Sequence, residues 1–327
     1  MQHGKFILSL DFELLWGVRD KKTIAQYGDN IKNVHQIFPE IIHSCDAYGV
    51  KTTVATVGML FFDDKSALLN HLPKCKPTYD DPNLSPYTQH IDAVLNMETA
   101  VYHFAKDWLL TLKKNKNHEI STHTFSHYYT MEPGQTKEQF EADLKQAIHI
   151  GQLHHIPTTS IIFPRNQFNP EYTEVLLQNG ITNYRGNEES WLYKSTTNSN
   201  QGLFKRALRL MDAYLNISGR NCYSDAFMKS QPLINIPSSR LLRAYHPKLS
   251  ILDGLKMKRI KDDMTHAAKN NLCYHLWFHP HNFGSHSSEN LQFLTAILKH
   301  YQYLNKQYQF SSYTMTELAT KLQNNHA

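Results

Sequence analysis

Glycine and proline are scarce in this sequence, with 13 of each in 327 residues, and the four cysteines form no CxxC pair. So little Gly and Pro, together with 12% aromatic residues, excludes a collagen-like, mucin-like or intrinsically disordered chain. No apolar run approaches the roughly 18 residues that span a bilayer, so we expect no integral membrane segment. The scattered cysteines predict reduced, mostly buried thiols rather than a disulfide framework.

Concentrated charge and a leader segment are also missing. The net charge is +5, and the basic residues are spread along the chain without a nucleic-acid-reading motif, which argues against a nucleic-acid partner. The first residues lack the apolar stretch of a signal peptide, so we expect a cytoplasmic location. The composition leaves the oligomeric state open.

Short apolar segments alternate with helical patterns along the chain. We expect strands at residues 6–11, 50–57, 119–123, 160–163, 181–184, 233–236, 273–278 and 310–313. We expect helices at residues 30–48, 97–113, 137–153, 171–178, 251–269, 288–304 and 316–322, and a basic amphipathic stretch at 203–217.

This alternation predicts βαβ units and a parallel sheet. Seven or eight such units that close on themselves favour a barrel over an open sheet. No glycine-rich phosphate loop follows the first strand, which weakens the nucleotide-binding alternatives. We therefore expect a single domain, residues 1–327, with a proline-rich loop insertion at about 72–90 and a basic insertion at about 194–232.

Two carboxylates end the first expected strand. Asp11 and Glu13 are two residues apart, so their side chains leave the strand on the same side. They lie at the C-terminal end of the strand, where parallel barrels carry their active sites. The alternative is that two solvated carboxylates merely begin a loop.

A pair of histidines ends the third expected strand. His123 and His127 are four residues apart, and one face of a helical turn would let both reach one metal ion. With 20 histidines in the chain, about one such pair is expected by chance. His275 and His279 form a second pair, but in a strand pattern that places them about 13 Å apart. The position at a strand end therefore favours the first pair. No Glu lies between them to act as a base, a role that Asp11 could take.

Two later strand ends carry further candidates. Arg165 follows the fourth expected strand, where it could hold an active-site carboxylate ionised, although a solvated surface arginine is the alternative. His279 and His281 share a face at the end of the strand at 273–278, and an imidazole there could donate a proton to a leaving group. His275 fits a buried structural histidine better.

These motifs together resemble the NodB-homology polysaccharide deacetylases of carbohydrate esterase family 4. They are Asp11 with Glu13, the run His123-Thr-Phe-Ser-His127, the Arg165 segment, the His279-Pro step and the ending Tyr313-Thr-Met-Thr-Glu-Leu. They occur in the family's order from residue 6 to about 322. The resemblance implies a distorted (β/α)7 TIM-like barrel with one divalent metal ion, commonly zinc. It also implies two His and one acidic metal ligand, an Asp base held by an Arg, and a His acid.

Two motifs differ from the family's pattern. The family's first motif has adjacent aspartates, whereas Asp11 and Glu13 are spaced by two, as in some bacterial members. The resemblance then makes Asp11 the base and Glu13 a metal ligand beside His123 and His127, with the exchange of the two acidic roles left open. The family's Arg-x-Pro order has become Pro164-Arg165-Asn166-Gln167, with Arg165 as the expected partner of Asp11.

The resemblance implies a metal-dependent hydrolase of carbon–nitrogen bonds that removes an acetyl group from an N-acetylated amino sugar, with His279 as the acid. Zn²⁺ is favoured, and Co²⁺, Ni²⁺ and Fe²⁺ also suit these ligands. Two alternatives stay open. One is an amidohydrolase acting on a cyclic amide or ureide, as in the allantoinase-like relatives of this fold. The other is a non-catalytic carbohydrate-binding barrel.

Without a signal peptide, the expected substrate is a nucleotide-linked or lipid-diphosphate-linked sugar used in surface polysaccharide biosynthesis. The residues expected to contact this substrate are Trp277, His281, Asn282, Arg240 and Arg243, the two arginines on the diphosphate. Further cationic candidates are Arg185, Lys205, Arg206 and Arg209. Tyr79 and Tyr87 of the proline-rich loop could cover the sugar.

Overall fold

A fully buried first strand organises the sheet. β1 (Lys5–Phe12) buries all eight of its residues, because side chains fill one face of the sheet and helices cover the other. It pairs in parallel with β2 on one side and with β8 on the other, and β9 pairs with its first two residues. The computed structural model describes residues 3–194, 197 and 202–324.

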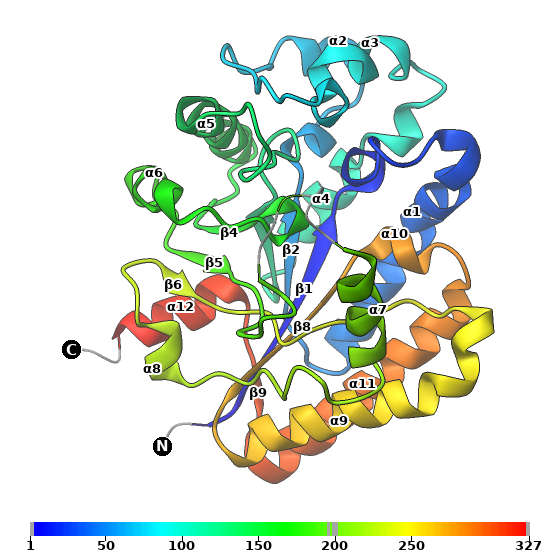
Figure 1. The fold of residues 1–327 in the computed structure, drawn as a ribbon, viewed down its shortest axis with the longest axis vertical. Helices are drawn as coiled ribbons and strands as arrows, with labels where there is room; N and C mark the ends of the chain where they lie inside the picture. Colours follow the sequence, from blue (N-terminus) through cyan, green and yellow to red (C-terminus); the bar gives the residue numbers. More distant parts are fainter. Residues whose placement is uncertain (1–2, 195–196, 198–201, 325–327) are drawn as a thin grey trace.

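Eight parallel strands form a curled half-barrel (Figure 1), in the order β6-β5-β4-β3-β2-β1-β8-β7. After β1 the strands are β2 (Thr52–Thr56), β3 (His118–Thr122), β4 (Ser160–Ile162), β5 (Asn183–Arg185), β6 (Ile234–Asn235), β7 (Arg240–Leu241), β8 (Cys273–Phe278) and β9 (Ser311–Ser312). The predicted distorted barrel is confirmed. The short strand β7 was not predicted, and with β6 it forms the two edges of the sheet.

Helices follow most strands and cover the outside of the sheet (Figure 1). They are α1 (Ile24–Ala47), α2 (Lys65–Leu69), α3 (Ile91–Ala93), α4 (Lys106–Lys113), α5 (Lys137–Leu153), α6 (Thr173–Gln178), α7 (Leu203–Asp212), α8 (Asp225–Met228), α9 (Asp253–Lys269), α10 (Pro280–Phe283), α11 (Ser287–Tyr308) and α12 (Met315–Asn324). None of the helices among the described residues is both long and apolar enough to cross a membrane.

Two predicted helices have different starts in the structure. α1 begins at Ile24 rather than near residue 30, because Thr23 and Gln26 form a capping box. The helix expected at 97–113 is wrong in its first half, since α4 begins only at Lys106. Asn96 and Thr99 bond each other's backbone N–H groups, a local pattern that competes with helix formation. The division into one domain with two insertions stays a prediction.

Candidate active site

The parallel register brings four strand ends to one rim of the barrel. Leu10 of β1 lies opposite Phe278 of β8, so His279 follows on beside Asp11. On the other side β1 neighbours β2, and β2 neighbours β3, whose last residue immediately precedes His123. The predicted rim residues thus converge because parallel strands end at the same edge.

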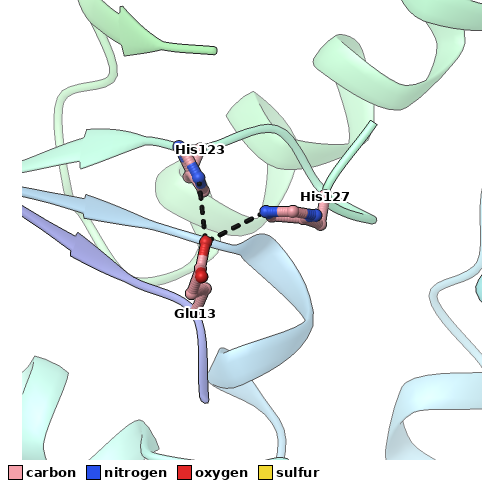
Figure 2. A group of neighbouring side chains, drawn as sticks. All are labelled: Glu13, His123 and His127. Carbon is pink, nitrogen blue, oxygen red and sulfur yellow. Dashed lines mark hydrogen bonds and ion pairs between the residues drawn. The ribbon is translucent and has the colours of Figure 1, made fainter. Parts of the chain in front are cut away.

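Glu13, His123 and His127 form one buried cluster at this rim (Figure 2). The Glu13 Oε2 atom lies 3.3 Å from His123 Nε2 and 3.0 Å from His127 Nε2. The three ligand atoms lie within 4.8 Å of one another, and all three side chains are buried. The structure therefore groups the predicted metal ligands around Glu13 rather than around Asp11.

The chemistry of this cluster fits a metal ion. His123 Nδ1 lies 2.7 Å from the Ile162 carbonyl oxygen, which can only accept a hydrogen bond, so Nδ1 carries the proton and Nε2 presents a lone pair to Glu13. Burial lowers the pKa of His127 to about 4 even though the Glu13 charge opposes this. The neutral His127 imidazole and the Glu13 carboxylate, whose pKa the surrounding imidazoles lower against burial, face the centre as electron donors, so a divalent cation could be held there.

The segment that carries the two histidines is not the helical turn that we predicted. Residues 123–127 form an irregular loop, with positive φ angles of 64° at Thr124 and 60° at His127. Asp143 of α5 shapes this loop, because its carboxylate accepts the N–H groups of Phe125 and Ser126 and the Ser126 hydroxyl. The four-residue spacing of His123 and His127 therefore predicted correctly that the two side chains lie close together. The loop that brings them together is held by the tertiary contact with Asp143.

Gly17 makes room for the Glu13 carboxyl. A Cβ atom at residue 17 would stand 2.0 Å from the Glu13 carboxyl carbon, far inside van der Waals contact. The 3-10 turn Leu14–Gly17 that follows β1 therefore folds back over the metal-ligand candidate. Sequence reasoning missed this glycine, since the signal lies in a close approach that only the fold produces.

Asp11 is held by Arg185 and not by Arg165, so the predicted Arg165 partnership is wrong. The Arg185 guanidinium donates to both carboxylate oxygens, at 2.7 and 2.8 Å, and also to Asn166 at 2.8 Å. Burial alone would raise the pKa of Asp11, but the Arg185 charge and hydrogen bonds outweigh it and lower that pKa. Arg185 ends β5 at the same rim, a position that could have identified it in the sequence.

Arg165 forms a separate ion-pair cluster. Its guanidinium bonds Asp20 and Glu132 and stacks 3.9 Å from the centre of the Tyr129 ring. The turn at Pro164–Asn166 has positive φ at both Arg165 and Asn166, which points the two side chains to different partners. Asn166 reaches Arg185 from this turn, and Arg165 does not reach Asp11.

A chain of hydrogen bonds connects His275 and Ser9 to Arg185, the partner of Asp11. His275 Nδ1 lies 3.1 Å from the Ile236 carbonyl, so its Nε2 accepts from the Ser9 hydroxyl at 2.8 Å. The Ser9 oxygen in turn accepts from Arg185 at 3.0 Å. Burial lowers the pKa of His275 to about 3, so the ring stays neutral. The expectation that His275 is a buried structural histidine is confirmed.

His279 stands between the two carboxylates. Its Nε2 atom lies 3.7 Å from Asp11 Oδ2 and 3.7 Å from Glu13 Oε1. Asn282 Nδ2 lies 3.4 Å from His279 Nδ1, while the Asn282 oxygen accepts from the Tyr27 hydroxyl at 2.9 Å. This arrangement leaves the proton of a neutral His279 on Nε2, which faces the site. Tyr27 had no signal in the sequence.

His281 lies deeper in the same cluster. Its Nδ1 is 3.7 Å from Glu13 Oε1, and its ring stacks on that of His279. The side chain is buried, and burial lowers its pKa to about 4. The prediction that His279 and His281 share one face is confirmed.

A cationic cavity lies beside Arg185, since two of its lining residues, Asn166 and Trp277, contact that side chain. Its described lining includes five cationic side chains, Arg165, Lys194, Arg209, Arg240 and Arg243, and one acidic side chain, Glu188. Trp277 also lines it, and the Arg185 guanidinium lies over the Trp277 ring, 4.1 Å from the ring centre, which connects the cavity to the partner of Asp11.

The six predicted diphosphate-binding cations therefore separate into groups. Arg209, Arg240 and Arg243 line the cavity, although Arg240 is also buried against Asp212 and Asp263. Arg185 is engaged with Asp11, and Lys205 and Arg206 of α7 are not among the lining residues.

Tyr79 and Tyr87 do not have the predicted position over a sugar. Tyr79 is buried, and its hydroxyl accepts a hydrogen bond from the backbone N–H of Tyr129, two residues after His127. Burial raises the pKa of Tyr87 above its ordinary range, and its hydroxyl is likewise enclosed. The proline-rich stretch thus supports the loop of His123 and His127 from outside.

No protein-family model matches the chain, and the comparison with curated proteins finds no relative. Among solved structures, the chain is similar to a protein assigned as a polysaccharide deacetylase from Mycobacterium smegmatis, with a TM-score of 0.58 and 10% identity over 100% of this chain and 92% of that one. A second protein with that assignment, from Pseudomonas aeruginosa PAO1, has a TM-score of 0.55 and 9% identity over 98% and 91%. Puue allantoinase has a TM-score of 0.53 and 11% identity over 98% and 90%.

These similarities concern the fold of the whole chain. They confirm the resemblance to the polysaccharide deacetylases at that level, and they show that the same fold also carries an allantoinase. Identities this low leave the reaction to be argued from the site itself.

Proposed function

We propose that this protein is a metal-dependent N-deacetylase acting on an N-acetylated amino sugar. The observation that carries the proposal is the juxtaposition of the buried Glu13, His123 and His127 cluster with the Asp11–Arg185 pair. A divalent ion at this cluster would polarise an acyl carbonyl and lower the pKa of a water molecule. Zn²⁺ is the proposed ion, and Co²⁺, Ni²⁺ and Fe²⁺ suit the same ligands.

Asp11 would act as the general base. Arg185 holds its carboxylate ionised and oriented, and Oδ2 faces the same space as His279 Nε2. An ionised, oriented carboxylate can take a proton from an attacking water at neutral pH. The bidentate guanidinium limits rotation of the carboxylate, which maintains the reactive geometry.

His279 would act as the general acid. The Asn282 amide orients Nδ1, so that the Nε2 proton faces the two carboxylates and can pass to the departing amine. With 22% of its side chain exposed, His279 is the more accessible of the stacked pair, and His281 is nearly enclosed. The substrate would therefore meet His279 first.

The proposed substrate carries the sugar on a diphosphate, as a nucleotide- or lipid-linked form used in surface polysaccharide biosynthesis. The cationic cavity beside Trp277 supports this part, because Arg209 and Arg243 could bind phosphate oxygens with their planar forks. A cytoplasmic location stays a prediction from the sequence.

A second candidate is hydrolysis of a cyclic amide or ureide. The similarity in fold to an allantoinase favours this second candidate, since the same proposed metal ion and base could open a ring amide. A non-catalytic carbohydrate-binding barrel is the third hypothesis. A complete set of base, ligands and acid at one rim argues against it.

One experiment separates the three functions. The purified protein is assayed for metal content, for acetate release from a panel of N-acetyl sugars, and for hydrolysis of allantoin. Bound metal with acetate release supports the proposal, and allantoin turnover alone supports the second candidate. Sugar binding without either reaction would leave the non-catalytic hypothesis.

The carrier is tested by comparing the free and the diphosphate-linked N-acetyl sugar as substrates. We expect a higher kcat/KM for the linked form in the wild type, and Arg243→Ala should abolish that preference. Arg243 is a better test than Arg240, whose loss would leave Asp212 and Asp263 buried without their partner. Equal rates on both forms would show that no diphosphate site exists.

A further inference from the structure

An ordinary surface helix turns its apolar side toward the protein, whereas α7 turns its polar side inward. Its last residue, Asp212, is fully buried and pairs with Arg240 and Arg259. Arg209 of the same helix donates from Nε to the Leu192 carbonyl at 2.8 Å. The polar side of α7 (green in Figure 1) is therefore the side that packs against the rest of the protein.

The apolar side of α7 is exposed. Phe204, Ala207 and Met211 follow helical spacing along one face, and Phe204 is 73% exposed and Met211 47% exposed. Leu210 lies on the same side, and Leu215, 51% exposed, continues it beyond the helix end. An exposed apolar helix face of this kind marks a surface that binds a partner.

The charged side chains of α7 that are at least partly exposed are basic. Lys205 and Arg206 belong to this set, while Arg209 packs inward and the single acid of the helix, Asp212, is buried and paired. Arg206 is exposed on α7 and lies near Lys21, whose pKa is lowered by burial and by Arg165, raised by Asp20 and lowered again by Arg206. Bulky apolar side chains flanked by cations complement an anionic, amphipathic surface.

The size of the face argues against a second copy of this chain as its partner. A helix of ten residues is about 15 Å long and about 10 Å across. Its exposed apolar side chains offer on the order of a few hundred Å² of accessible surface, which is below the roughly 800 Å² per partner of a stable protein interface. A membrane needs no such matching area, because each inserted side chain leaves water independently.

We propose that the apolar face of α7 docks on a membrane surface that carries anionic lipid headgroups. The helix lies flat with Phe204 and Met211 among the lipids and Arg206 at the headgroups. Arg209 and Ala213, on and just after the inward side of α7, line the cationic cavity, so docking brings that cavity to the membrane. The inference goes beyond the proposed deacetylation, and its test needs no substrate.

The test is flotation of the full-length protein with vesicles of phosphatidylcholine alone or with about 30% phosphatidylglycerol. We expect the wild type to float with the anionic vesicles and much less with the neutral ones. Phe204→Ser/Met211→Ser should lower the bound fraction by at least about tenfold. Arg206→Glu should weaken binding to the anionic vesicles only. The matched control, Met97→Ser/Leu153→Ser, alters two exposed apolar residues outside α7 and should float like the wild type.

Three results would overturn the proposal. The first is a wild type that floats with neither vesicle, and the second is a Phe204→Ser/Met211→Ser variant that floats normally. The third is light scattering that shows a wild-type dimer which this variant converts to a monomer, since the face would then bind a second copy. Thermal unfolding of the variants should match the wild type, because the replaced side chains are exposed.

Discussion

Asp11 and Glu13 leave the same strand end two residues apart, yet the fold gives them opposite surroundings. Asp11 meets the permanent charge of Arg185, which neutralises it without any added ion. Glu13 meets the imidazoles of His123 and His127, which offer ring nitrogen atoms and carry no permanent charge. The difference supports the proposed roles, because a carboxylate with its own cation is suited to be a base and a carboxylate among ring nitrogen atoms is suited to be a metal ligand.

The largest effect should come from removing a ligand at the Glu13 side. His127→Ala should lose most bound metal and lower activity by about a thousandfold or more, because metal catalysis contributes several kcal/mol to the transition state. Metal content by elemental analysis and acetate release measure the two losses. Full metal occupancy in this variant would contradict the assignment of the cluster.

A smaller loss should follow removal of the proton donor between the two carboxylates. His279→Ala should lower kcat by about 10²- to 10⁴-fold and flatten the basic limb of the pH profile of kcat/KM. Its metal content should stay normal, because His279 is not one of the three clustered ligand candidates. If His281→Ala produces this result and His279→Ala does not, the acid is His281.

The role of Asp11 can be tested with a substitution that leaves the metal-ligand candidates unchanged. Arg185 lowers the pKa of Asp11, so Arg185→Gln should raise that pKa and move the acid limb of kcat/KM to higher pH. We expect activity to fall about ten- to hundredfold through lost orientation, with metal content unchanged. Arg165→Gln is the matched control, and its acid limb should stay in place. If Arg165→Gln moves the acid limb and Arg185→Gln does not, Arg165 is the partner of Asp11, as predicted from the sequence.

A comparable effect, confined to metal binding, is expected from a methyl group beside Glu13. Gly17→Ala places a Cβ where the Glu13 carboxyl lies, so that carboxyl must shift. We expect about 10- to 100-fold weaker metal binding, comparable to the loss of an outer-shell partner. Calorimetric titration with Zn²⁺ measures this, and the Asp11-dependent acid limb of the residual activity should not move. Unchanged metal affinity would show that Glu13 is not a ligand.

The local sequence was enough to predict most of the strands, their order along the chain and the residues at their ends. A buried strand has its signature in its own apolar run, and the parallel arrangement then sends Asp11, Glu13, His123 and His279 to one rim. The ligand spacing of His123 and His127 was a correct signal, although the helical turn assumed for it was wrong.

The sequence by itself determined which residue types meet at the rim, because residue types and strand ends are local properties. Only the tertiary structure decided which arginine holds Asp11, since Arg165 follows β4 and Arg185 ends β5, and the two differ in the direction that the backbone gives their side chains. The same holds for Asp143, which binds the loop of His123 and His127 from another element, and for Gly17, whose close approach to Glu13 depends on the fold of the turn after β1. It also holds for α7, whose amphipathic pattern is visible in the sequence but whose outward apolar face is set by the buried Asp212.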